Sequence, residues 1–506
     1  MKSFSKGKNM RSIFLRFQFV FLFFSFCSPA IFKSPCDLSS TTFQTGFLLR
    51  ALNGDTFSYC GIGSESFRSG SSSSNLPTVT YPTSSFTFTK NISIDTITPI
   101  ITGSITSCTA SPALVAGLTI SATDCSISGR PLASQITTSH TISFSGATGS
   151  SSTSINIEVR LQASKFIIVA NSGSNNLNVF SINANGSLTS VPGSPFVAGG
   201  AGARFVVVNP LGTYAYVANG GSASVSVFSI NSTTGFLTPI AGSPFATAPV
   251  SPANPSSLAM DPNGKFLYIS PTPGNTLYVH SINQTTGALT YVNTYTTVNT
   301  ANLSFITIDV TGRFLYNTIT NATNNIDGFR IDATTGALTQ ISGLPLTAGN
   351  NMGIGAVDPF TRFYYSISYS SNTLSGYLVN STTGALSPIA GSPFSDPAFG
   401  TSSTMAIDPT GKFVYVANNT TPTISGFSIN QSTGAVTSIG SAVATGAAPG
   451  GIAVDPTGKF LYVTNGGPAT VSGYSINATT GVLTAVPGSP FSTVTTNPNA
   501  FSFVSY

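Results

Sequence analysis

The chain has 506 residues, 41% of them hydrophobic, which is enough to bury several cores. Only 7% of the residues are charged, and Ser, Thr, Gly and Asn are abundant; this composition disfavours surface helices and favours strands and turns. The net charge of +5 comes from five cations in the first 16 residues, because the remaining 19 − 5 = 14 basic residues are balanced by 14 acidic ones. A neutral chain without a basic cluster excludes nucleic acid and anionic headgroups as expected partners.

Residues 1–30 have the features of a signal peptide. The five cations precede an apolar run at 17–26, which is too short to span a bilayer comfortably but has the length of a signal-peptide core. We therefore expect export, and an uncleaved N-terminal anchor is the alternative. Cleavage before Cys27 would make it a lipid-modified first residue, although Phe26 and Phe24 depart from the usual lipobox that this stretch resembles. Cleavage after Ala30 would release a secreted protein.

Cysteines are expected to form disulfides. Either cleavage leaves Cys36, Cys60, Cys108 and Cys125 in an oxidising compartment. Three pairings are possible, and we predict the neighbouring pairs Cys36–Cys60 and Cys108–Cys125. A metal site is the alternative, but no Cys-x-x-Cys spacing or adjacent histidine supports it, so neither a metal nor another cofactor is predicted.

Residues 31–77 carry the first cysteine pair and end in a Ser/Gly-rich linker. Short apolar runs then occur at 86–89, 92–94, 118–120, 141–144 and 155–159. Their alternation predicts strands, and five or more short strands predict a small β-sandwich over 78–160. The turns at 112–118 and 127–131 resemble those of immunoglobulin-like domains in bacterial surface proteins. That resemblance implies a spacer or stalk.

One aromatic strand motif recurs seven times after residue 163. Successive anchors lie 48, 52, 48, 49, 50 and 47 residues apart, at Phe166, Tyr214, Phe266, Phe314, Phe363, Phe413 and Phe460. A period near 50 residues that contains only strand and turn signals is typical of propeller blades. The last repeat shows four strands, at 451–454, 460–463, 471–476 and 483–486.

The first repeat lacks its preceding strand, and the end of the chain supplies one. Residues 500–504 have the pattern of a first strand but no repeat follows them. By joining the first repeat they would close the ring and leave no open sheet edge. We therefore predict an all-β protein with a seven-bladed β-propeller over 163–506, closed by its C-terminal strand, behind an N-terminal Ig-like sandwich.

A column of small residues begins the first strand of every repeat, and one arginine interrupts it. The column contains Arg204, Ser256, Ser304, Gly353, Ser403, Gly450 and Ala500. These positions should ring one mouth of the propeller channel, where an arginine can hold an anionic or polar ligand bidentately. Arg204, Ser256, Ser304 and Ser403 are therefore the candidate ligand-binding residues. A packed or solvated arginine is the alternative.

The other polar groups of the repeats are expected to be structural. One aspartate opens the same turn in five repeats and should cap backbone N–H groups there, at Asp261, Asp309, Asp358, Asp408 and Asp455. Asn-x-Ser/Thr triplets are expected in the turn after the third strand, at Asn231, Asn283, Asn321, Asn380, Asn430 and Asn477. His280, the only histidine of the repeats, is expected on an exposed blade face and not at a catalytic position.

The segments Tyr216-Val217-Ala218-Asn219 and Tyr462-Val463-Thr464-Asn465 resemble the YVTN-type repeats of the lactonase-like seven-bladed propellers. The resemblance covers residues 163–506. In members with lactonase or cyclase activity, one blade begins Pro-Arg-His and later carries a glutamate after the asparagine. Here Arg204 matches, whereas Phe205 replaces the histidine and Gly220 the glutamate. Acid–base catalysis needs a titratable group within reach of the substrate, so these replacements argue against hydrolysis.

The function expected from the sequence is therefore a binding module. We predict a surface protein of the cell envelope, held by its lipid anchor alone or secreted, whose propeller binds a protein, a glycan or a small ligand. The alternative is a lactonase-type hydrolase, similar to 6-phosphogluconolactonases, with altered active-site residues. Lactone turnover that depends on Arg204 would decide between the two.

Overall fold

The structure of the chain is a computed structural model. It describes residues 76–90, 94–131, 135–160, 164–249, 253–297, 303–319, 326–348, 352–368, 371–396, 399, 402–493 and 498–505. All regular elements in these ranges are β-strands, as the composition predicts. No helix in the described ranges is long and apolar enough to cross a membrane. The predicted signal peptide, the lipid attachment at Cys27 and the Cys36–Cys60 bridge lie outside the described residues.

The first nine strands form three small sheets. A four-stranded sheet has the order β2 (Ser85–Thr89), β9 (Gly149–Arg160), β8 (Gln135–Gly146), β5 (Ser107–Ser111). A three-stranded sheet has the order β3 (Ile94–Ile97), β7 (Ile127–Gly129), β6 (Leu118–Ile120), and β1 (Thr78–Thr80) pairs with β4 (Ile100–Thr102). All three sheets contribute to one core, in which Ile127, Ile142 and Ile157 are fully buried.

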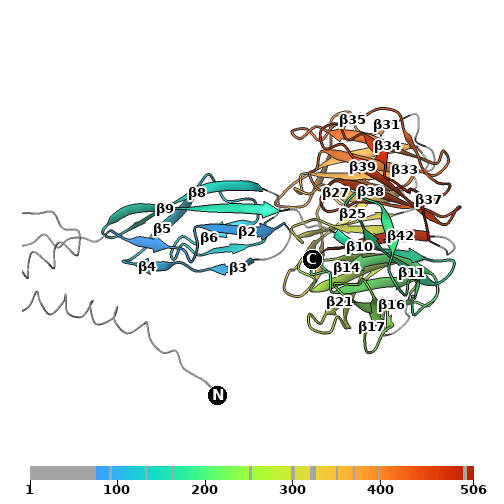
Figure 1. The fold of residues 1–506 in the computed structure, drawn as a ribbon, viewed down its shortest axis with the longest axis horizontal. Helices are drawn as coiled ribbons and strands as arrows, with labels where there is room; N and C mark the ends of the chain where they lie inside the picture. The colour runs from blue at the N-terminus through green and yellow to red at the C-terminus, as the bar shows by residue number, and fades with distance from the viewer. Residues whose placement is uncertain are drawn as a thin grey trace, which may run out of the picture. The chain divides into compact units, whose positions relative to one another are not determined.

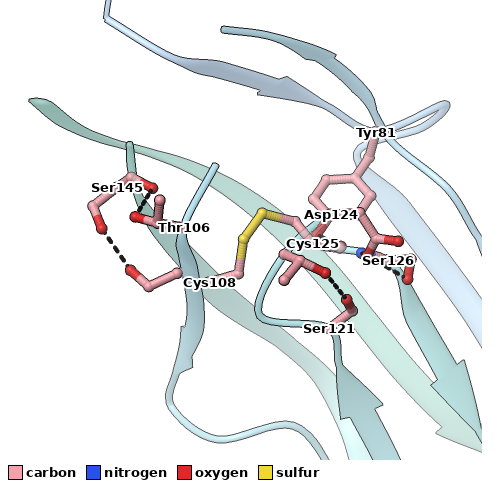
Figure 2. The surroundings of a disulfide bond; sticks show 10 residues. Tyr81, Thr106, Cys108, Ser121, Asp124, Cys125, Ser126 and Ser145 are labelled. Carbon is pink, nitrogen blue, oxygen red and sulfur yellow. Dashed lines mark hydrogen bonds between the residues drawn. A yellow bond between two sulfur atoms is a disulfide. The ribbon is translucent and has the colours of Figure 1, made fainter. Parts of the chain in front are cut away.

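A disulfide crosses this core. Cys108 lies on β5 and Cys125 lies in the loop between β6 and β7, with their Cα atoms 5.5 Å apart, as the cysteine spacing predicts. Figure 2 shows Tyr81 beside the bond, where its hydroxyl donates to the carbonyl of Cys125 at 2.6 Å. A hydrogen bond from Ser121, together with those that the Asp124 carboxylate accepts from the Ser126 N–H and hydroxyl, lowers the pKa of Asp124 to about 2. The bridge therefore joins two sheets through a tightly held loop.

Seven further sheets of antiparallel strands follow, and in six of them all the strands are consecutive in the sequence. Their first strands are β14 (Ala203–Val208), β19 (Pro255–Met260), β23 (Leu303–Ile308), β27 (Met352–Val357), β32 (Ser402–Ile407), β37 (Pro449–Val454) and β42 (Pro498–Ser505). Their second strands are β10 (Ser164–Asn171), β15 (Tyr214–Asn219), β20 (Phe266–Pro271), β24 (Phe314–Ile319), β28 (Phe363–Ser368), β33 (Phe413–Asn418) and β38 (Phe460–Asn465). Every second strand begins at or just before its aromatic anchor.

The third strands are as long as the inner strands, whereas six of the seven fourth strands have only three residues. The third strands are β11 (Asn176–Ile182), β16 (Ser224–Ile230), β21 (Thr276–Ile282), β25 (Ile326–Ile331), β29 (Thr373–Val379), β34 (Thr423–Ile429) and β39 (Thr470–Ile476). The fourth are β12 (Leu188–Ser190), β17 (Leu237–Pro239), β22 (Leu289–Thr296), β26 (Leu338–Gln340), β30 (Leu386–Pro388), β35 (Val436–Ser438) and β40 (Leu483–Ala485). In five sheets a two-residue strand continues the fourth position: β13 (Phe196–Val197), β18 (Phe245–Ala246), β31 (Phe394–Ser395), β36 (Val443–Ala444) and β41 (Phe491–Ser492).

The last strand of the chain belongs to the first of these sheets. The sheet has the order β12, β11, β10, β42, and β42 runs antiparallel to β10 from Ser164↔Ser505 to Asn171↔Pro498. Figure 1 shows β42 beside β10. The pairing that residues 500–504 predict is therefore present.

Buried tyrosines link six of the seven sheets to the next one. Six second-strand hydroxyls donate to a turn glycine carbonyl of the following sheet at 2.5–3.0 Å: Tyr216 to Gly287, Tyr268 to Gly336, Tyr316 to Gly384, Tyr365 to Gly434, Tyr415 to Gly481 and Tyr462 to Gly186. The last of these bonds joins the seventh sheet to the first. The equivalent position in the first sheet is Ile168, which has no hydroxyl to donate.

Candidate functional site

A β-bulge marks the same place in all seven first strands. The ladder to the second strand skips one or two residues there, for example between Ala203 and Phe205 and between Pro255 and Ser257. The column positions that begin these interruptions are Arg204, Ser256, Ser304, Gly353, Ser403 and Gly450. In β42 the bulged residue is Asn499, because Ala500 pairs directly with Ala170. The predicted column therefore assigns Ala500 to a position that Asn499 occupies in the structure.

Arg204 is exposed and lies over Gly220. A Cβ atom at Gly220 would come within 2.8 Å of both Cδ and Nε of Arg204, and within 3.2 Å of the carbonyl oxygen of Pro255. A side chain at position 220 would therefore require the flexible Arg204 side chain to move. The glycine N–H donates to Gly202 at 2.8 Å, so its backbone extends the β14–β15 ladder beneath the guanidinium.

Ser256 follows the carbonyl that approaches Gly220 and is partly buried. Its hydroxyl donates to the carbonyl of Ser270 at 3.0 Å and accepts from the Thr272 hydroxyl at 2.9 Å. Ser256 and Arg204 therefore occupy the bulges of adjacent sheets, and both the Pro255 carbonyl and the Arg204 side chain lie close to Gly220. Ser304 and Ser403 keep their column positions on β23 and β32, but their side chains lie outside the described part of the chain.

His280 is buried, and the prediction of an exposed position is wrong. It is 2% exposed and packs against Tyr291, with ring centroids 5.8 Å apart. Its Nδ1 atom has no hydrogen-bond partner in the structure, and burial lowers its pKa to about 4. The interpretation failed because His280 pairs with Leu267 on the second strand, in the column that holds Phe or Tyr in the other sheets.

The repeated aspartates cap their turns as predicted. In each of the five turns, one carboxylate oxygen accepts from the N–H five residues on, and in four of them the other accepts from the N–H two residues on. At Asp261, burial raises the pKa against the opposing effect of these bonds. None of the five aspartates is distinguished from its copies by an open oxygen. They hold the turn and leave Arg204 as the candidate for binding.

The asparagine turns are confirmed where the structure describes them. The side chains of Asn231, Asn283, Asn380, Asn430 and Asn477 accept from the N–H groups two and three residues on. Asn321 lies outside the described residues. In its repeat, Asp332 accepts the equivalent hydrogen bonds.

Asp327 is a buried acid that sequence reasoning missed. It lies on β25, is fully buried, and leaves its Oδ2 atom without a partner, while Oδ1 accepts from the Gly328 N–H at 2.8 Å and from Gln340. Burial raises its pKa. The signal was available, because four other sheets have serine at this strand position: Ser226, Ser375, Ser425 and Ser472.

No cluster of three or more His, Cys, Asp or Glu side chains in the described ranges could hold a metal ion. The site is therefore an arginine, a serine and bare glycine backbone on two neighbouring sheets. Such a group can bind an anion or stabilise negative charge that develops on a carbonyl oxygen.

Three comparisons place this fold among known proteins. Solved structures that resemble it include a putative 6-phosphogluconolactonase from Bacteroides fragilis (20% identity, TM-score 0.58) and the periplasmic gluconolactonase PpgL from Pseudomonas aeruginosa (16%, 0.57). Each alignment covers 67% of this chain and 98% of the other chain. No curated protein matches the sequence. The model of the family described as "Lactonase, 7-bladed beta-propeller" matches residues 119–352 and 355–495, and the chain therefore belongs to that family.

Proposed function

We propose that this chain is a lactonase-type hydrolase whose site lies at the bulges of the first strands, centred on Arg204. Family membership and the two lactonase-named structures support this function over the binding module. The observation on which the proposal depends is the exposed Arg204, which is the one cation among the seven bulged positions.

The proposed architecture is a closed ring of seven blades. The first strands are neighbours in the order β42, β14, β19, β23, β27, β32, β37 and again β42. The β10–β42 ladder and the Tyr462–Gly186 hydrogen bond join the two ends of the series. In such a ring the bulges surround one mouth of a central channel, and Arg204 faces whatever enters there.

In the proposed reaction, Arg204 binds the carbonyl oxygen of the lactone. Water adds to the carbonyl carbon, the ring C–O bond breaks, and the ring oxygen takes a proton, so that the product is a hydroxy acid. The guanidinium stabilises the negative charge on the carbonyl oxygen as water adds, which is the interaction that accelerates acyl transfer. Its place over Gly220 leaves the guanidinium uncrowded by a side chain from that position.

A ligand-binding module is the second candidate function, and a specific observation favours it. Phe205 and Gly220 stand where the resemblance implies a histidine and a glutamate, and His280 is buried on the third strand β21. Without a general base, binding of an anionic ligand by Arg204 would not be followed by turnover.

An assay of the purified chain against five- and six-membered lactones tests the proposal. Acid release measured with a pH indicator should fall on the order of 100-fold in Arg204→Ala, the usual effect of losing one oxyanion donor. Lys265→Ala is the matched control, because it removes an exposed cation that lies just before the second strand β20, after the turn at the opposite end of β19 from its bulge. Activity in this control should be unchanged.

A result of no turnover in the parent chain would overturn the hydrolase proposal. If Phe205→His combined with Gly220→Glu then gains turnover, the site has the family's geometry but has become a binding site. Equal turnover in Arg204→Ala and the parent would show that Arg204 neither binds the lactone carbonyl nor stabilises the charge that develops on it.

We also propose the domain order and location that the sequence predicts. These are a cleaved signal in 1–30, a cysteine-containing segment and linker in 31–77, an immunoglobulin-like spacer over 78–160, and the propeller over 163–506. The shared core of the sheets in 78–160 and the Cys108–Cys125 bridge support the spacer and an oxidising location.

A further inference from the structure

Lys90 is a buried cation at the end of the sandwich sheet. It follows β2 and is only 6% exposed. Its Nζ atom donates to the carbonyl of Pro409 at 2.8 Å, in the turn that begins at Asp408. Burial lowers the pKa of Lys90, and the nearby Asp408 opposes that change. Burying a charged lysine costs free energy unless polar or charged groups compensate. The Pro409 carbonyl and the nearby Asp408 provide that compensation for Lys90.

Arg130 makes the same kind of contact with two other sheets. It follows β7, is partly buried, and donates from Nη1 to the carbonyl of Pro262 at 3.1 Å and from Nη2 to the carbonyl of Val310. Its charge interacts favourably with Asp261 and Asp309. The planar guanidinium of Arg130 thus bridges two adjacent repeats, because its two Nη groups donate to one carbonyl in each.

The three acceptors occupy one position of the repeat. Pro262, Val310 and Pro409 each follow the turn aspartate that links a first strand to a second strand. That turn lies at the opposite end of the first strand from the bulge that carries Arg204. The two cations therefore contact the face of the propeller away from the candidate site, and the strands concerned fall within one compact unit, Asn75–Tyr506.

We infer that the sandwich is a fixed cap on the turn face of the propeller, held by Lys90 and Arg130 through the carbonyls of Pro262, Val310 and Pro409. With that face covered, ligands reach the first strands from the Arg204 end. The cap would direct access and orientation in the same way whether the site hydrolyses a lactone or only binds one.

The homologous turns provide an internal control. The turns 209–212, 358–361 and 455–458 have the same i to i+3 backbone hydrogen bond as the contacted turns 261–264, 309–312 and 408–411. Within the described ranges, no hydrogen bond from the sandwich reaches Pro210, Pro359 or Pro456. Hydrogen exchange by mass spectrometry on the full chain can follow both sets in one sample.

In the double variant Lys90→Ala, Arg130→Ala, exchange in the three contacted turns should become about tenfold faster, because hydrogen bonds from charged donors are lost. Exchange in the three homologous turns should not change. Arg160→Ala is the control, since it removes an exposed sandwich cation paired with Glu158. Unchanged exchange in the contacted turns of the double variant would overturn the cap, and equal acceleration of both sets would show a general loosening of the propeller instead.

Discussion

At the scale of single residues, the burial of His280 follows from its place in the repeat. His280 occupies the third-strand column that elsewhere holds Phe180, Phe228, Phe329, Tyr377, Phe427 and Tyr474. The imidazole therefore serves as a packed aromatic ring, and its burial keeps it neutral.

His280 should make the fold sensitive to acid. The pKa of His280 is lowered from 6.5 to about 4. Between these two pH values the imidazole is protonated in the unfolded chain and neutral in the folded chain. Stability is therefore lost between pH 6.5 and pH 4, by up to about 3 kcal/mol. We expect His280→Phe to reduce the fall in thermal midpoint between pH 7 and pH 4.5. An identical fall in the variant and the parent chain would contradict this account.

Asp327 should have the opposite pH dependence. Burial raises its pKa above 3.8, so the folded chain retains a proton that the unfolded chain releases as pH rises. Stability is complete at acidic pH and is lost as pH rises through the raised pKa. Asp327→Asn keeps the Oδ1 acceptor and removes the charge. Its thermal midpoint at pH 8 should rise by about 2–5 °C.

The control for Asp327 is Asp332→Asn. Asp332 is an exposed turn residue whose pKa is lowered by hydrogen bonds from Thr335 and Thr334. Asparagine fills the same turn in the other described repeats, so this variant should leave the midpoint at pH 8 nearly unchanged. A similar rise in both variants would show that general charge removal, and not burial at Asp327, is the cause.

At the scale of elements, β42 completes the first sheet. The backbone of Ile167, Ile168 and Val169 is paired with β42 on one side and with β11 on the other, and all three residues are fully buried. Without β42, several buried N–H and C=O groups would lose their partners at a cost of roughly 1–3 kcal/mol each.

Deletion of Ala500–Tyr506 should therefore lower the thermal midpoint on the order of 5–10 °C or more. The matched control is deletion of Ser505 and Tyr506 alone, which retains the pairs from Val504 to Ala500. Calorimetry of the two truncated chains beside the parent measures the effect. If the longer deletion has the same thermal midpoint as the parent chain, the ladder between β10 and β42 does not stabilise the first sheet.

At the scale of the whole molecule, the repeat could be predicted from the sequence because each sheet is built from similar residues at equivalent positions. The aromatic anchors begin the second strands, and the turn aspartates cap backbone N–H groups as the pattern indicates. The Cys108–Cys125 bridge was predictable for a similar reason, since both cysteines lie in one small domain.

The remaining features depend on contacts that no local pattern specifies. His280 is polar, and only its register opposite Leu267 shows that it must be buried. Asn499 replaces Ala500 at the bulge because β42 pairs with a second strand, β10, to which it is not joined by the short turn that follows the other first strands. Arg204 was found as an exception in a column, but its position over Gly220 required the backbone of the neighbouring strand.

The β10–β42 ladder also bears on how the protein is made. Val169 pairs with Phe501, 501 − 169 = 332 residues further along the chain. Contacts of such long sequence separation form slowly, because the chain must close a large loop before they contribute. During synthesis the edge of β10 that pairs with β42 is therefore open until β42 emerges, and an open strand edge can pair with another molecule. The nascent chain should be most prone to aggregation just before its last strand is complete.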